Sequence, residues 1–111
     1  MNTEVVTVEE MFVSVADRLI AENPGLEQAR MFGSTGLRTE SGKFAGFARG
    51  DELVVKLPAD RVAELLESGE GSIFDAGKGR PMKEWVSLHP ADEATLERYL
   101  LEAREFVRTA P

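Results

Sequence analysis

The sequence contains no cysteine. Disulfide bonds, thiol nucleophiles and cysteine-ligated zinc are therefore excluded. Histidine is nearly as scarce, because His89 is the only one, and a metal site or catalytic relay usually needs several converging partners. His89 precedes a proline at a predicted strand-to-helix junction, where helix capping or plain solvent exposure explains it better. We expect neither a metal nor a cofactor.

Long apolar runs are also lacking. No stretch approaches the roughly 18 to 20 apolar residues that are needed to span a bilayer. The first residues, Met1 to Val8, contain no basic cluster followed by an apolar run, so they predict no signal peptide. We therefore expect a cytoplasmic protein with no membrane partner.

Acidic residues are numerous, but a general acid and base would have to converge in an apolar cleft. The carboxylates fall instead on the predicted outer faces of helices, where solvation explains them better. They include Glu9, Glu10, Glu64, Glu67, Glu93, Glu97, Glu102 and Glu105. We predict no catalytic residues and expect that the protein is not an enzyme.

The net charge of −7 disfavours direct binding to nucleic acid, because phosphate recognition depends largely on cations. The acidic segments mostly coincide with predicted helices, and the mildly basic segments with predicted strands. A local basic strip on the strands therefore stays open as an alternative, although ordinary solubilising charge is the simpler interpretation.

The length of 111 residues, with 42% hydrophobic and 30% charged residues, is typical of one globular domain. A domain of this size buries roughly two thirds of its unfolded surface, which is enough for a core without metal or disulfides. No linker, repeat or low-complexity tract divides the chain. We expect a single domain over residues 1–111.

The amino-terminal segment predicts an amphipathic helix. Thr7 and Glu10 have the spacing of a capping box, in which a hydroxyl and a carboxylate satisfy free backbone amides. The sequence Asn23-Pro24-Gly25 ends the helix, since proline cannot continue the hydrogen-bond ladder. The apolar stripe recurs at spacings of three and four and consists of Val8, Met11, Phe12, Val15, Ala16, Leu19 and Ile20.

The next segment changes to short β-compatible runs at Gln28–Phe32, Gly36–Arg38, Lys43–Arg49 and Glu52–Leu57. Glycine-containing turns at residues 40–42 and 49–51 are typical of hairpins. Connections this short require antiparallel pairing. We expect these runs to form a three-stranded meander.

The second half predicts a helix at Ala59–Glu67, a short extended piece at Ser72–Phe74, a strand at Met82–Leu88 and a last helix at Ala91–Arg108. The resulting order is α-β-β-β-α-β-β-α. Separated helices mixed with runs of strands favour an α+β fold. We expect two layers, with a five-stranded antiparallel sheet and three helices on one of its faces.

An ordered set of residues along the middle of the chain resembles the TfoX N-terminal domain family, in the form of short stand-alone bacterial proteins. The resemblance covers residues 8–107, and its most specific part is the run from 77 to 86. The residues that carry it are Met31, Phe32, Gly33, Gly36, Leu37, Phe74, Gly77, Gly79, Arg80, Met82 and Trp85.

The resemblance implies a two-layer α-β(3)-α-β(2)-α arrangement similar to secretion-chaperone-like domains, in agreement with the order above. The family takes its name from a bacterial competence regulator that carries a second, carboxy-terminal domain. This sequence ends at Pro111, after the third predicted helix, so we expect the form without that domain. The resemblance implies a regulatory role linked to transcription or competence.

The turn Gly77-Lys78-Gly79-Arg80 has two interpretations. Glycine-flanked cations can cradle a phosphate, because free backbone amides and a nearby ammonium both favour anions. This turn, however, leads into a strand rather than a helix and lacks the Walker spacing. We favour a tight structural turn.

The last predicted strand places Val86 and Leu88 on one face and Lys83 and Trp85 on the other. If Val86 and Leu88 face the helices, Trp85 lies on the open face of the sheet as a candidate contact for a partner. The alternative is that Trp85 packs under the loop 75–80 or a chain end. We take Lys78, Arg80, Lys83 and Trp85 as the candidate interaction surface.

Two functions of different class follow. The first is a non-enzymatic regulatory or adaptor module that binds a protein partner, or a second copy of the chain, through this surface. The second is a nucleic-acid-binding domain, which requires that the basic side chains share one surface. Those side chains are Arg30, Arg38, Lys43, Arg49, Lys56, Lys78, Arg80 and Lys83. We favour the first.

Overall fold

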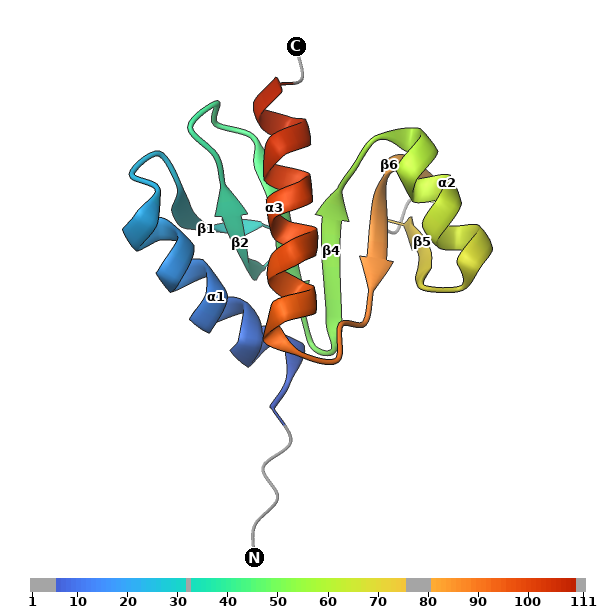
Figure 1. Ribbon diagram of the computed structural model, residues 1–111, viewed down its shortest axis with the longest axis horizontal. Helices are drawn as coiled ribbons and strands as arrows, with labels where there is room; N and C mark the ends of the chain where they lie inside the picture. The colour runs from blue at the N-terminus through green and yellow to red at the C-terminus, as the bar shows by residue number, and fades with distance from the viewer. Residues whose placement is uncertain (1–5, 32, 76–80, 110–111) are drawn as a thin grey trace, which may run out of the picture.

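Within residues 6–31, 33–75 and 81–109, which the computed structural model describes, the chain forms three helices and a six-stranded antiparallel sheet (Figure 1). At positions 31, 75, 81 and 82 only the backbone is described. In chain order the elements are α1 (Val8–Glu22), β1 (Glu27–Met31), β2 (Ser34–Arg38), β3 (Phe44–Arg49), β4 (Glu52–Lys56), α2 (Ala59–Ser68), β5 (Gly71–Asp75), β6 (Pro81–Leu88) and α3 (Glu93–Thr109).

The predicted α+β class is confirmed, but the predicted number of strands is wrong. The segment expected to be a three-stranded meander contains four strands, so the sheet has six strands in the described residues instead of five. The extra strand arises because the chain reverses sharply between Met31 and Ser34, with Gly33 at a φ of 75°. A side chain is disfavoured at this backbone angle, whereas glycine adopts it readily.

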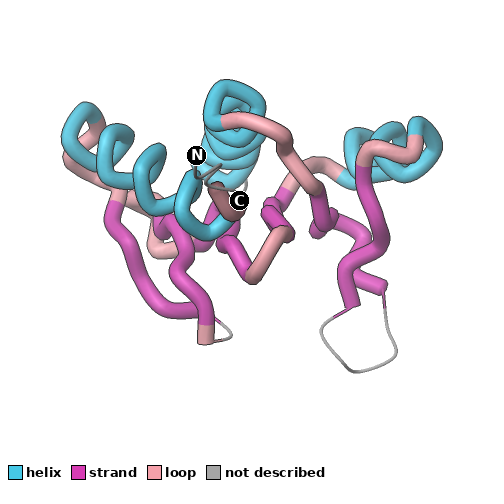
Figure 2. The backbone as a smooth tube through the Cα atoms, turned by 90° about the horizontal axis from the view of Figure 1, so that it is seen from below, coloured by secondary structure: helices cyan, strands magenta, loops and turns pink. Residues whose placement is uncertain are grey.

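The sheet has the order β1-β2-β3-β4-β6-β5, and each neighbouring pair is antiparallel. β6 therefore lies between β4 and β5, and β5 becomes an edge strand of the described sheet. The helices lie along one side of the sheet, while the strands near both of its edges bend toward the other side (Figure 2). α3 crosses the middle of the sheet, α1 lies beside it, and α2 covers the β5–β6 end (Figure 1).

The predicted capping box is present at the start of α1. The Thr7 hydroxyl accepts a hydrogen bond from the Glu10 amide at 3.2 Å, and the Glu10 carboxylate accepts one from the Thr7 amide. At the other end, the Asn23 side chain donates to the Leu19 carbonyl at 2.9 Å. Local residues therefore fix both ends of α1 at the predicted positions.

A hydrophobic core fills the space between the helices and the sheet. Phe12 and Val15 of α1 and Leu100 of α3 are fully buried, and they face the inward side chains of the central strands. Leu53 and Val55 of β4 and Leu57, which follows the strand, all belong to this core, because alternate residues of an extended chain point to the same face. Fully burying a side chain of this size contributes roughly 1.5–3 kcal/mol, so the helix stripes hold α1 and α3 on the sheet.

Phe12 and Val13 offer a matched test of this core. Phe12 is 0% exposed, whereas its neighbour Val13 is 42% exposed on the outer face of α1. We expect Phe12→Ala to lower the free energy of unfolding by about 3–5 kcal/mol, because it leaves a cavity. Val13→Ala is expected to change it by no more than about 0.5 kcal/mol. Urea denaturation followed by circular dichroism measures both, and equal effects would contradict the assigned packing.

Candidate interaction site

A second, smaller hydrophobic cluster lies on the face of the sheet opposite the helices. It consists of Phe47, Val54, Phe74 and Trp85, with the partly buried Phe44 packed against it. The ring centroids of Phe47 and Phe74 are 5.8 Å apart, and the Trp85 ring lies 6.2 Å from the first and 6.3 Å from the second. These spacings are typical of attractive aromatic packing.

This cluster decides between the two interpretations of Trp85, a solvent-facing contact and a packed side chain, in favour of the packed one. Val86 and Leu88 face the helices, and Trp85 lies on the opposite face, but its side chain is only 8% exposed. The strands that carry Phe47 and Phe74 bring their rings against the indole. Trp85 is therefore mainly a core residue, and it is not the open contact point that alternation alone suggested.

Of the other three residues of the predicted interaction surface, the structure describes only Lys83. Lys83 is exposed on β6, whereas Lys78 and Arg80 lie outside the described residues, together with Gly77 and Gly79. The same is true of Phe32 and of the side chains of Met31 and Met82. Of the remaining residues that carried the family resemblance, Gly33 forms a turn, Gly36 and Leu37 are buried in β2, and Phe74 belongs to the second cluster.

The basic residues of the alternative hypothesis are divided between surfaces. Strand pairing places Arg38, Arg49 and Lys56 on the face opposite the helices, whereas Lys83 lines the groove beside α2. Arg30 alternates to the helix-covered face, where its guanidinium donates to the Gly33 carbonyl at 2.9 Å.

Two of the three cations on the face opposite the helices are already neutralised within the chain. Arg38 forms an ion pair with Glu27, and Arg49 forms one with Glu52 at 3.3 Å. Arg49 also lies over the Phe74 ring, 5.8 Å from its centroid. Lys56 and Lys83, in contrast, have no recorded ion pair or hydrogen bond among the described residues.

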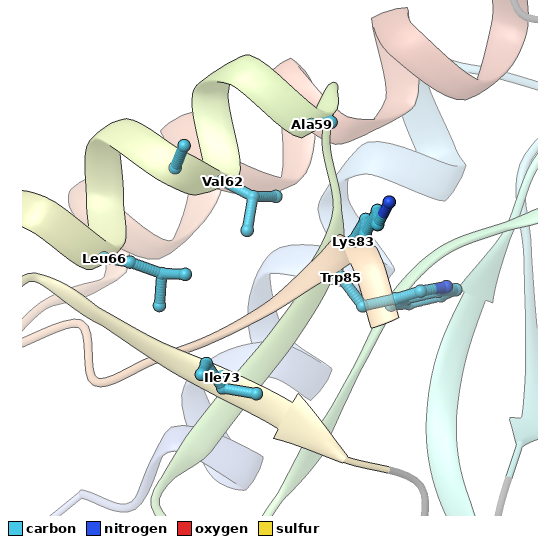
Figure 3. Close-up of a pocket in the computed structure, with 7 residues that line it drawn as sticks. Ala59, Val62, Leu66, Ile73, Lys83 and Trp85 are labelled. Atoms are coloured by element: carbon cyan, nitrogen blue, oxygen red, sulfur yellow. The ribbon is translucent and has the colours of Figure 1, made fainter. Parts of the chain in front are cut away.

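An apolar groove lies between α2 and the strands β5 and β6 (Figure 3). It has a volume of about 260 Å³. Val62 and Leu66 point from α2 toward the strand that carries Ile73, and Lys83 and Trp85 lie at the far end (Figure 3). Its lining includes Ala59, Val62, Ala63, Leu66, Ile73, Lys83 and Trp85.

Ile73 is the most exposed large hydrophobic residue in the described part of the chain, at 61%. It lies on the edge strand beside the groove, where no described element covers it. Sequence reasoning placed an extended piece here but did not recognise the site. The available signal was the isoleucine in an uncharged run at 71–74, because exposed edge strands normally carry charge or proline.

A second hollow, of about 460 Å³, adjoins the groove and shares Ala59, Lys83 and Trp85 with it. Lys56 and Glu84 complete its described lining. Lys56 pairs directly with Trp85 across β4 and β6. The apolar groove therefore continues into a hollow lined by Lys56, Lys83 and Glu84, two cations and one anion.

A more polar hollow lies at the amino-terminal end of α3 and is lined in part by Glu70, His89, Arg98 and Tyr99. The Tyr99 hydroxyl donates to the Glu70 carboxylate at 2.9 Å, and His89 Nδ1 lies 3.0 Å from the Asp51 carbonyl oxygen. The first contact ties α3 to the residue before β5, and the second ties the segment after β6 to the turn between β3 and β4. The described residues contain no group of three potential metal ligands and no helix long and apolar enough to cross a membrane.

No protein-family model matches the chain, and no curated protein or solved structure matches it either. The resemblance to the TfoX N-terminal family therefore stays a prediction.

Trp85→Ala tests whether the indole is a core residue. We expect this substitution to lower the free energy of unfolding by about 3–5 kcal/mol, because it removes the centre of the second cluster. Lys83→Ala, two residues away and exposed, is expected to change it by no more than about 0.5 kcal/mol. Urea denaturation checks both values. A neutral effect of Trp85→Ala would show that the tryptophan is a surface residue after all.

Tyr99 makes the free energy of unfolding depend on pH in the alkaline range. Burial, followed by the hydrogen bond to Glu70, raises the pKa of Tyr99. The folded state therefore holds this proton more tightly than the unfolded chain. The resulting stability is complete below the ordinary tyrosine pKa of about 10 and is lost as the pH rises through the raised value.

We expect the urea midpoint of the wild type to fall more between about pH 9 and pH 11 than that of Tyr99→Phe, since lysine deprotonation is common to both. An equal fall of the urea midpoint in the two proteins would contradict a raised pKa for Tyr99.

Proposed function

We propose that the protein is a non-enzymatic regulatory or adaptor module that binds a partner protein through the groove between α2 and β5. The observation that carries this proposal is the 61% exposure of Ile73 on an edge strand beside an apolar groove. Binding sites are typically concave and mostly apolar, with a few polar groups that fix orientation. The groove has this composition, with Lys83 at one end.

The exposed hydrophobic residues elsewhere support the choice of this groove. In the described residues the other large ones are Val6, Val13 and Leu101, at 52%, 42% and 37% exposure. Single exposed apolar residues are normal on a protein surface. Ile73 differs because Ala63 and Leu66 of α2 continue its apolar surface across a hollow. A partner's apolar side chain placed there would be enclosed on several sides, as interface anchors usually are.

The link to regulation comes from the resemblance to the TfoX N-terminal family. That family supplies the regulatory context, and the groove supplies a means of contact with a second protein. Of the surface predicted from the sequence around Trp85, this proposal keeps the exposed Lys83 as a contact residue. It adds the groove-facing side of α2 and Ile73, and the buried Trp85 lines the end of the groove.

A direct nucleic-acid-binding domain is the second candidate. It is supported by Lys56, which lies on one face with Arg38 and Arg49, and by Lys83, which lines the same hollow as Lys56. It is weakened by the ion pairs of both arginines and by the net charge of −7. Such binding would weaken steeply with added salt.

Ile73→Asp tests the proposed groove against Val13→Asp, which places the same charge on another exposed apolar position. We expect wild type and Val13→Asp to retain similar amounts of partner protein from cell extract. Ile73→Asp is expected to retain at least about tenfold less, because a carboxylate buried in an apolar contact is costly. Quantitative mass spectrometry of the retained proteins measures the ratio. Equal retention by all three proteins would contradict the groove, and nuclease-sensitive retention would favour the nucleic-acid hypothesis.

A further inference from the structure

The two edges of the described sheet differ in how they are protected. β1, at one edge, carries Glu27 and Arg30, and charged residues of this kind discourage another chain from pairing with an edge strand. β5, at the other edge, has its one charged residue, Asp75, at its end, and it has no charge and no proline in the run Gly71-Ser72-Ile73-Phe74. Within the described residues no strand pairs with the outer edge of this run.

The groove lies where the side chains of such a strand would fall. Ile73 pairs with Val86, which faces the helices, so Ile73 also points to the helix-covered side. A strand added beside β5 would lie about 4.8 Å away, with alternate side chains on this side. Those side chains would reach the apolar surface formed by Val62, Ala63 and Leu66 of α2.

The charges indicate which occupant fits. Lys83 lines the groove, and Lys56 lies in the adjoining hollow together with Glu84. In the described part of the chain, the two lysines are the only cations with no recorded ion pair, hydrogen bond or ring contact. An exposed ammonium gains most from a carboxylate brought beside it in a partly desolvated site. The favoured occupant is therefore mainly apolar, with one carboxylate at the lysine end of the groove and no acidic residue along the acidic α2.

A second copy of the chain fits the same edge poorly. Pairing β5 with β5 of another copy would bring the two α2 helices toward each other. α2 carries exposed Asp60, Glu64 and Glu67, and the whole chain has a net charge of −7. Like charges facing each other disfavour the pairing.

We propose that β5 accepts an extended segment of a partner protein as an added strand, with an aliphatic side chain in the groove below α2 and a carboxylate against Lys83 and Lys56. This inference rests on the proposed protein-binding function and specifies its mode. Main-chain hydrogen bonds to β5 supply affinity, while the groove and the two lysines select the sequence.

The test begins with a phage-displayed library of random linear peptides panned against the wild-type chain. We expect enriched peptides to carry aliphatic residues at alternate positions and at least one Asp or Glu. Nuclear magnetic resonance with a synthetic copy of an enriched peptide should show the largest amide shifts at Ser72, Ile73 and Phe74.

Backbone methylation separates strand addition from side-chain docking alone. In an added strand only alternate amides of the peptide face β5. Two versions of the peptide are made, with N-methyl groups on one or the other alternate set of amides. We expect one version to lose at least about tenfold in affinity and the other to retain most of it. Equal affinity for both versions overturns strand addition.

Charge reversal tests the two lysines. We expect Lys56→Glu and Lys83→Glu, made singly, each to weaken the peptide at least about fivefold. Lys43→Glu, an exposed lysine in the turn between β2 and β3, makes the same change of charge and should leave affinity within about twofold. Effects of the first two variants no larger than that of Lys43→Glu overturn the assigned role of Lys56 and Lys83.

The remaining outcomes distinguish this inference from the proposed function. Peptides that bind elsewhere, or equally well to Ile73→Asp, overturn strand addition at β5 while leaving protein binding intact. The library could enrich no peptide while Ile73→Asp still retains less partner protein from cell extract than wild type does. That result overturns an extended segment as the occupant and favours a folded partner. A cross-linked dimer joined through β5 identifies a second copy as the occupant and also overturns the inference.

Discussion

The pairing of β4 with β6 is the constraint on which the rest of the structure depends. Val55 pairs with Val86 and points into the core beneath the helices, while the adjacent Val54 and Trp85 point into the aromatic cluster on the opposite face. Both valines of β4 are fully buried, so the centre of the sheet is covered on both faces. This pairing also places β5 at an edge and α2 beside it, and the candidate site forms there.

Local signals predicted the parts of the fold that local residues determine. The capping box at Thr7 and the Asn23-Pro24-Gly25 stop fixed α1, and alternation correctly placed Val86 and Leu88 of β6 on the face opposite Trp85. The strand count was wrong because Gly33 was not recognised as the turn between two short strands. Burial of Trp85 could not be predicted from its own strand, since the rings that cover it belong to β3 and β5.

The candidate site depends on contacts between segments far apart in the sequence. Ile73 looks like an ordinary strand residue until β6 inserts between β4 and β5 and leaves it at an edge. Lys83 was predicted as a contact residue, but its connection with Lys56 requires the β4–β6 pairing. Together these residues combine an apolar groove, a strand edge without charge at residues 71–74 and two lysine ammonium groups. This combination is the basis of the proposed protein-binding surface.

The central claim is that a partner protein meets the chain at Ile73, and site-specific photo-cross-linking in living cells tests it most directly. A diazirine-bearing amino acid is placed at position 73 in one variant and at position 13, on the outer face of α1, in the other. The account predicts a discrete covalent adduct with another protein from position 73 and little from position 13. Equal yields at the two positions, or adducts with nucleic acid alone, would contradict it.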